Sequence, residues 1–314
     1  MEKMASINWP DLHLIFLLIV CAVVPNSAAD QYYLDSYCPN TTIFAPHSQY
    51  DTNLNTLLGS LSSNAASNPD GFYSRSIGDG TNDTVYGLFL CRGDLNTSSC
   101  SDCVNNATLE LPAKYCPNIA EAIIWYEGCM FRYSNKSFFR KSEVVPGLYL
   151  CNTQNFTDNN ATMAQFGHAV RELMRNASSQ AAMGGSEKKF STISYNFSRS
   201  VTLYSLAQCT PDLSQKDCDH CLTYAISQLP IREGGRALLP SCNFRYEIYP
   251  FFKDLDAAPP TGGKPVHRIP NLSASPPASP ASHMTGKSIK LPYFTSQDQN
   301  FTSYPFFFFA PSCS

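Results

Sequence analysis

The stretch Cys91-Arg-Gly-Asp-Leu-Asn-Thr-Ser-Ser-Cys100-Ser-Asp-Cys103 has a counterpart later in the chain, Cys209-Thr-Pro-Asp-Leu-Ser-Gln-Lys-Asp-Cys218-Asp-His-Cys221. Both stretches space their cysteines as C-x8-C-x2-C. Their surroundings repeat as well, since Cys129-Met-Phe-Arg-Tyr matches Cys242-Asn-Phe-Arg-Tyr. A repeat of roughly 110–120 residues is much longer than the unit of a solenoid, so it indicates a duplicated domain.

Each copy combines helical and strand patterns. Apolar residues recur at helical spacing over 54–65 in the first copy and over 166–177 in the second. A second helix is expected after each Cys-x2-Cys pair and should end at Pro112 or Pro230. Aromatic and β-branched residues at 122–126 and 244–249 are typical of strands. The sequence therefore predicts an α+β fold for each copy.

The N-terminal segment is typical of a secretory signal peptide. An apolar run from Leu12 to Val24 is followed by Pro25 and by small residues suited to cleavage. The run is shorter than the roughly 20 residues of a membrane-spanning helix, and no second long apolar run follows. We therefore expect a protein without a membrane span that is secreted into the extracellular space.

The chain divides by composition into four parts. We expect a signal peptide at 1–29, one domain at 30–140 and a second domain at 141–254. The remaining segment, 255–314, is rich in proline and has no hydrophobic periodicity, so we expect a linker and a disordered tail.

Composition and motifs exclude several classes of function. The 314 residues include 22 basic and 25 acidic ones, with a net charge of −3, and no cluster of basic residues suits a nucleic acid. The histidines show no metal-ligand spacing, and no nucleophile, phosphate-loop or kinase motif is present. We therefore expect no enzymatic activity, no cofactor and no metal. The tripeptide Arg92-Gly93-Asp94 matches an integrin-binding motif, which we attribute to chance.

The cysteines allow three interpretations. A zinc ribbon needs two neighbouring Cys-x2-Cys pairs, whereas here the pairs lie in separate copies. A thioredoxin-like site needs a reduced pair at the start of a helix. Structural disulfides suit small secreted domains and are the interpretation that we favour.

Glycosylation sequons are frequent, as expected of a secreted chain. Asn-X-Ser/Thr occurs at Asn40, Asn82, Asn96, Asn106, Asn135, Asn155, Asn160, Asn176 and Asn196 in the two domains, and at Asn271 and Asn300 in the tail.

Two stretches of the second copy carry a family resemblance. The sequences Cys209-Thr-Pro-Asp-Leu213 and Gly234-Gly-Arg-Ala-Leu-Leu-Pro-Ser-Cys-Asn-Phe-Arg-Tyr-Glu247 resemble the ginkbilobin-like, salt-stress/antifungal domain of plants. Two such domains after a signal peptide resemble a cysteine-rich repeat secretory protein or the ectodomain of a cysteine-rich receptor-like kinase. The resemblance covers 30–254 and implies, for each domain, two helices packed on a five-stranded antiparallel sheet.

The resemblance also implies a set of disulfides, which are Cys38–Cys116, Cys91–Cys100, Cys103–Cys129, Cys209–Cys218 and Cys221–Cys242. The second domain departs from the pattern, because Gly234 stands where the partner of Cys151 would be. Three alternatives then remain for Cys151: a buried thiol, a bond to Cys313 or a bond to another chain. A reactive thiol would also allow a role as a sensor of extracellular oxidants.

The resemblance also implies a binding site for mannose in the second domain. Ginkbilobin holds mannose with an Asn after its first cysteine and with an Arg and a Glu around its last one. The second domain has Asn152, Arg236 and Glu247 at these positions, whereas the first domain has other residue types. Carboxylate, guanidinium and amide groups together suit sugar hydroxyls. The alternative is a structural ion pair between Arg236 and Glu247 on adjacent strands, with Asn152 in a turn.

Two functions follow from this resemblance. The first is a secreted recognition protein in plant defence or stress, with an antifungal role, that binds a mannose-type glycan through its second domain. The alternative is a non-catalytic module that interacts with receptor-like kinase ectodomains and binds no small ligand. In that case the chain is a truncated or alternatively spliced receptor product.

Overall fold

The computed structural model describes residues 32–39, 41–157, 161–186 and 188–252. The expected signal peptide at 1–29 and tail at 255–314 lie outside the described residues, as do the sequons at Asn40, Asn160, Asn271 and Asn300 and the cysteine Cys313.

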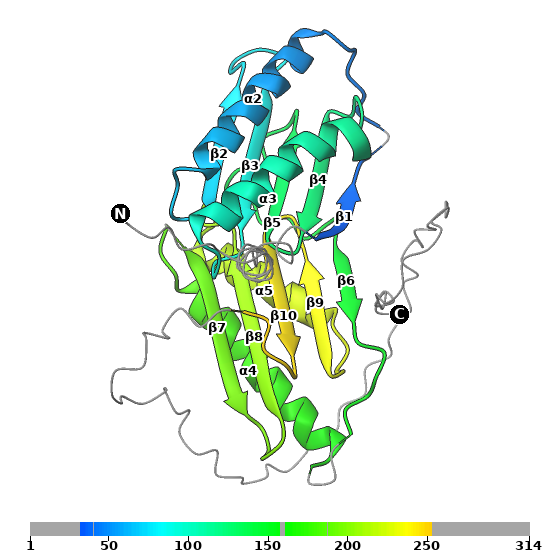
Figure 1. Cartoon of the computed structure of the whole chain (residues 1–314), viewed down its shortest axis with the longest axis vertical. Coiled ribbons are helices and arrows are strands. Elements are labelled where there is room, and N and C mark those ends of the chain that lie inside the picture. Colours follow the sequence, from blue (N-terminus) through cyan, green and yellow to red (C-terminus); the bar gives the residue numbers. More distant parts are fainter. Residues whose placement is uncertain (1–31, 40, 158–160, 187, 253–314) are drawn as a thin grey trace, which may run out of the picture. The chain divides into compact units, whose positions relative to one another are not determined.

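The first domain is a five-stranded antiparallel sheet with two helices on one face (Figure 1). The strand order is β1-β4-β5-β3-β2. Its elements are β1 (Tyr33–Tyr37), α2 (Gln49–Ala65), β2 (Phe72–Ile77), β3 (Val85–Cys91), α3 (Thr97–Glu110), the π-helical turn η2 (Leu111–Tyr115), β4 (Glu121–Tyr126) and β5 (Cys129–Ser134).

The second domain repeats this architecture, with the strand order β6-β9-β10-β8-β7. Its elements are β6 (Leu148–Cys151), α4 (Met163–Ala182), β7 (Lys189–Asn196), β8 (Thr202–Cys209), α5 (Gln215–Ser227), β9 (Gly234–Leu238) and β10 (Cys242–Glu247). The prediction of two tandem α+β domains, each with two helices on a five-stranded antiparallel sheet, is confirmed.

Each core lies between the helices and one face of the sheet. Leu57 and Leu61 of α2 are fully buried in the first domain, as are Phe166 and Val170 of α4 in the second. Their spacing follows the helical period that the sequence shows. Because successive strand residues point to opposite faces, each sheet also has an outer face that the helices do not cover.

The second helix of each domain begins earlier than expected. Both Cys-x2-Cys pairs lie within the helix rather than before it, because a side chain upstream of the first cysteine caps the helix. Asn96 accepts a hydrogen bond from the Ser99 N–H in the first domain, and Ser214 accepts one from Asp217 in the second. Pro112 also differs from expectation, since it lies within η2, which continues from α3.

Five disulfides join the described cysteines in the expected pairs, namely Cys38–Cys116, Cys91–Cys100, Cys103–Cys129, Cys209–Cys218 and Cys221–Cys242. The prediction that Cys151 could remain a buried thiol is wrong, because Cys151 is disulfide-bonded as well. The hypothesis of an oxidant sensor needed a free thiol at Cys151 and is therefore wrong as well. Within the described parts of the chain, no helix has both the length and the apolarity to cross a membrane.

Candidate functional site

Two of the three predicted sugar-binding residues, Arg236 and Glu247, lie on neighbouring strands of the second sheet, and Asn152 directly follows β6. Arg236 of β9 pairs in register with Leu150 of β6 and with Arg245 of β10. Glu247 of β10 pairs with Gly234, whose carbonyl accepts a hydrogen bond from the Asn152 backbone. The side chains at 152, 236 and 247 therefore share the outer face of the sheet.

Arg236 does not pair with Glu247 but reaches into the first domain. Its Nη1 lies 2.5 Å from Oε2 of Glu127, a residue in the turn between β4 and β5. The side chain of Arg236 is only 9% exposed. The alternative interpretation, an ion pair between Arg236 and Glu247, is therefore wrong in its choice of partner.

Two more arginines converge on the same carboxylate. Arg245 Nη1 lies 2.7 Å from Glu127 Oε1, and Arg92 Nη1 lies 3.0 Å from the same oxygen. We call Glu127 and these three arginines the Glu127 cluster. Burial alone would raise the pKa of Glu127, but Arg236, Arg245 and Arg92 outweigh burial and lower that pKa below its ordinary value.

Further carboxylates balance the remaining charge. Arg92 makes a two-pronged contact with Asp94, whose carboxylate accepts from Nε at 2.6 Å and from Nη2 at 3.0 Å. Arg245 Nε lies 3.0 Å from Glu247 Oε1. Three arginines thus face three carboxylates, and this match is what allows so many charges to share a half-buried site. Because Arg92 and Asp94 contact each other, the Arg-Gly-Asp tripeptide forms an internal ion pair.

Glu247 and Asn152 meet around Gly234. A β-carbon at position 234 would lie 1.9 Å from Glu247 Oε2 and 3.0 Å from Asn152 Nδ2. Burial raises the pKa of Glu247 despite the opposing charge of Arg245. No hydrogen bond to Oε2 is formed within the described residues. Two of the three predicted residues therefore share one location, while Arg236 points to Glu127.

The space beside Arg236 is small. A cavity of about 20 Å³ lies among Arg236, Glu127, Trp125 and Leu238. A cavity of roughly this size holds one water molecule, so a sugar ring does not fit there without movement of the domains. A larger open groove, about 840 Å³, has walls from both domains, including Phe72 of β2 and Gln215 of α5.

Sequence reasoning missed Glu127, Arg92 and Arg245, although one signal was present. The matched segments at 129–133 and 242–246 each contain an arginine, Arg132 or Arg245, on an outer sheet face. Each guanidinium stacks on an aromatic ring six residues later in the chain, at 3.8 Å from the Phe138 ring centroid and 4.3 Å from that of Phe251. Arg132 also lies 2.6 Å from Glu143, in the segment that connects the domains.

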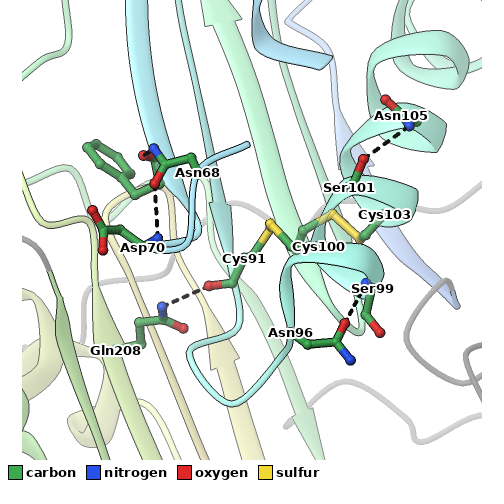
Figure 2. The surroundings of a disulfide bond; sticks show 12 residues. Asn68, Asp70, Cys91, Asn96, Ser99, Cys100, Ser101, Cys103, Asn105 and Gln208 are labelled. Carbon is green, nitrogen blue, oxygen red and sulfur yellow. Dashed lines mark hydrogen bonds between the residues drawn. A yellow bond between two sulfur atoms is a disulfide. The ribbon is translucent and has the colours of Figure 1, made fainter. Parts of the chain in front are cut away.

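Apolar and backbone contacts accompany the charges. Leu238 of β9 packs in a cluster with outer-face residues of the first sheet, among them Leu90 and Trp125. Gln208 of β8 donates a buried 2.9 Å hydrogen bond to the carbonyl of Cys91, next to the Cys91–Cys100 disulfide (Figure 2). The Glu127 cluster is thus the charged part of a continuous contact between the two domains.

Groups suited to binding a metal ion do not gather in the described residues. No set of three or more His, Cys, Asp or Glu side chains has the geometry of a metal site in that part of the chain. His220, which lies between the cysteines of the second Cys-x2-Cys pair, is an exposed residue of α5.

A comparison with protein families finds one match in each domain. The family model described as "Salt stress response/antifungal" matches residues 37–136 and 150–249. Among curated relatives, cysteine-rich receptor-like protein kinase 25 of Arabidopsis thaliana is 39% identical over 88% of this chain. The putative cysteine-rich receptor-like protein kinase 9 of the same plant is 43% identical over 75% of this chain.

The chain spans only part of several relatives. It covers 40% of kinase 25 and 36% of kinase 8, but 88% of the putative kinase 9.

Solved structures resemble the tandem fold. The tandem DUF26 ectodomain of the Arabidopsis thaliana receptor-like protein PDLP5 gives a TM-score of 0.56 at 29% identity, covering 69% of this chain and all of that chain (100%). The corresponding PDLP8 ectodomain gives 0.59 at 23% identity, covering 69% and 98% of the two chains, and at that identity it shows the fold alone.

Proposed function

Because this chain belongs to the salt stress response/antifungal family, with two copies of the family's domain, we propose that it is an extracellular recognition module that binds a protein partner. In this proposal the two domains act as one rigid unit. Arg236 holds the second domain to the first instead of binding a sugar.

The observation that carries the proposal is the Glu127 cluster. One carboxylate of the first domain receives Arg236 and Arg245 from the second at 2.5 and 2.7 Å. Charged groups in such a half-buried contact fix the register of two surfaces more than they add affinity. In this proposal, the contact holds together the two walls of the groove and so fixes the shape of the groove. A fixed shape suits recognition of a protein surface, because less ordering is needed on binding.

The proposal also includes the location of the protein outside the cell. Disulfides persist in oxidising compartments, and the similar PDLP5 structure is an ectodomain. We therefore place this protein outside the cell, in the apoplast, with a role in defence or stress. The partners that we propose are the ectodomains of receptor-like kinases, because the curated relatives of this chain are themselves named receptor-like kinases.

The proposal is tested by binding measurements on the full secreted chain. A panel of receptor-like kinase ectodomains is immobilised, and the affinities of the wild type and of Glu127→Gln are compared. We expect saturable binding to at least one ectodomain and weaker binding of the variant, because loss of the charge loosens the two walls of the groove. Absence of binding across the panel would contradict the proposal.

Mannose-type sugar binding is the second candidate. The observation in its favour is that Asn152 Nδ2 and Glu247 Oε2 converge at Gly234, where the carboxylate oxygen has no hydrogen-bond partner within the described residues. Titration calorimetry with mannose and short mannans distinguishes the two candidates. Saturable heat that Glu247→Ala abolishes would support the sugar site. Binding of an ectodomain together with no heat up to millimolar sugar would leave Glu247 and Arg236 as structural residues.

A further inference from the structure

The two sheets have four edge strands, which are β1 and β2 in the first domain and β6 and β7 in the second. An edge strand presents backbone N–H and C=O groups that can pair with a strand of another chain. Proteins prevent such pairing with charged side chains, prolines, bulges or very short edges. The four edge strands differ in which of these features they have to prevent pairing with another chain.

Three of the four edges are protected in these ways. β1 has an irregular register between Tyr33 and Asp35, and Asp35 adds a charge. β2 presents the exposed Arg75 in its middle. β6 is only four residues long.

β7 has none of these protections within its own sequence. It is eight residues long and pairs with β8 in unbroken register from Lys189 to Asn196. Lys189 is its only charged residue, and that ammonium group is buried and donates to the Gly184 carbonyl at 2.7 Å. Residues 190–196 include no charge and no proline. A strand that is this long, regular and uncharged is a template for pairing with a second copy of itself.

A glycosylation sequon lies at the end of this strand. Asn196, Phe197 and Ser198 form the sequon, and Asn196 is exposed. Its Oδ1 accepts a 2.9 Å hydrogen bond from the Thr202 hydroxyl, which orients the amide. The Nδ2 atom, where a glycan attaches, forms no hydrogen bond within the described residues. The acceptor nitrogen therefore faces solvent beside the β7 edge.

Not every sequon is placed like this. Asn106 and Asn176 lie within helices α3 and α4 and are half-buried, so a glycan on either one would have to displace packed neighbours. Four other sequons of the described residues are exposed as Asn196 is, but none of them belongs to an edge strand: Asn82, Asn96, Asn135 and Asn155. Asn196 is therefore the sequon whose glycan would cover the edge that needs protection.

We propose that Asn196 carries an N-linked glycan that prevents β7 from pairing with β7 of a second copy of this chain. The inference rests on the extracellular location in the proposed function, because only a secreted chain meets the glycosylation machinery. The donor is an oligosaccharide linked to a lipid diphosphate. Asn196 Nδ2 bonds to the anomeric carbon, the lipid diphosphate leaves with the electron pair of the broken C–O bond, and the amide loses one proton.

The test uses the full chain secreted from a eukaryotic host. Peptide mass spectrometry measures occupancy at Asn82, Asn135 and Asn196, and sedimentation velocity measures self-association. We expect Asn196 to be occupied and the wild type to be monomeric. Asn196→Gln and Ser198→Ala both remove the glycan, and each should self-associate about tenfold more tightly, which is about 1.4 kcal/mol. Ser198→Ala keeps the Asn196–Thr202 hydrogen bond, and Asn196→Gln keeps the Ser198 hydroxyl that accepts from the Ser200 N–H, so the effect that the two variants share reports the glycan.

Two controls sharpen the result. Asn135→Gln removes a glycan at the end of the central strand β5 and should leave the protein monomeric. Adding Ser194→Lys to Asn196→Gln places a charge on the edge and should restore the monomer.

The outcomes separate this inference from the proposed function. An occupied Asn82 with an unmodified Asn196 would overturn the inference while leaving the extracellular location intact. An occupied Asn196 whose removal leaves the protein monomeric would overturn the shielding role. Absence of glycans at all exposed sequons would contradict the extracellular location as well.

Discussion

A β-carbon at position 234 would overlap the Glu247 carboxylate, at 1.9 Å from Oε2. The same position is where the sequence pattern of the first domain leads one to expect a cysteine. The second domain therefore has a carboxylate packed over a glycine where a third local disulfide would have been. At the scale of single residues, this replacement of a cysteine by Gly234 is the clearest difference between the two copies. It explains why the disulfide of Cys151 does not repeat the Cys38–Cys116 bond of the first domain.

Gly234→Ala should destabilise the second domain by about 1–3 kcal/mol, because the new methyl group displaces a buried carboxylate from its contact with Arg245. Thermal and chemical unfolding measure the loss. Gly59→Ala is the matched control, since Gly59 is an exposed residue inside α2 and a β-carbon there would meet no atom within 4 Å. That control should stabilise the protein by about 0.5–1 kcal/mol, and equal effects of the two changes would refute the packing argument.

Peptide mapping under non-reducing conditions tests the partner of Cys151. The ten other described cysteines bond among themselves, and Cys21 belongs to the expected signal peptide. The sequence left a bond to Cys313 and a bond to another chain open, and because Cys313 is the remaining cysteine of the chain we now expect a Cys151–Cys313 peptide. A cross-linked dimer through Cys151 would contradict it.

The residue scale also shows what the sequence could predict. The family resemblance implied Asn152, Arg236 and Glu247 as one set, and the structure places Arg236 and Glu247 on the adjacent strands β9 and β10, with Asn152 directly after β6. The sequence alone could not identify Glu127 as the partner of Arg236, because Glu127 lies 109 residues away in a turn of the other domain. Local patterns indicate strands and faces, whereas contacts between two folded surfaces depend on how those surfaces meet.

At the scale of elements, the helices obeyed their periodic patterns and differed mainly at their starts. The expectation that α3 and α5 follow the Cys-x2-Cys pairs overlooked the caps at Asn96 and Ser214, which start each helix before its first cysteine. Because the cysteines then lie in the helix, each pair can direct its two sulfurs to different strands. Cys218 bonds to β8 and Cys221 to β10.

Ser214→Ala removes the cap of α5 and should cost about 1 kcal/mol of unfolding free energy, because the Asp217 N–H loses its acceptor. Denaturant titration measures the cost. Ser227→Ala, at the other end of α5, is the comparison, since its hydroxyl donates to a carbonyl of the last turn and accepts from the exposed Gln228 side chain but accepts from no backbone N–H. A cost at Ser227 equal to that at Ser214 would argue against the capping role.

At the scale of the whole molecule, the Glu127 cluster predicts a pH dependence of stability. The arginines lower the pKa of Glu127 in the folded state, so its contribution is present above the ordinary carboxyl pKa and is lost as the pH falls through the folded value. Glu247 acts in the opposite direction, because its folded pKa is raised. The difference between wild type and Glu127→Gln isolates the first contribution.

Glu127→Gln should therefore destabilise the protein by about 2–5 kcal/mol at pH 7, and the difference from wild type should shrink as the pH falls towards 3. Denaturation at several pH values checks this. Glu172→Gln breaks an exposed pair with Arg175 on α4 and should change stability by less than about 1 kcal/mol at any pH. A Glu127 effect that stays constant with pH would show that shape, not charge, explains the loss.

The two domains have the same fold but unlike outer faces. The outer face of the first domain carries Leu90, Trp125 and the turn with Glu127. The outer face of the second domain carries Leu238, Arg236 and Arg245. The order of the copies along the chain is therefore not interchangeable. A chimera made of two first domains would lack the guanidinium group of Arg236, because the first domain has Ile123 at the matching position, and one made of two second domains would lack Glu127, because the second domain has Pro240 there. Two domains with the same fold therefore carry different residues on their outer faces, and the face of each domain is complementary to the face of the other.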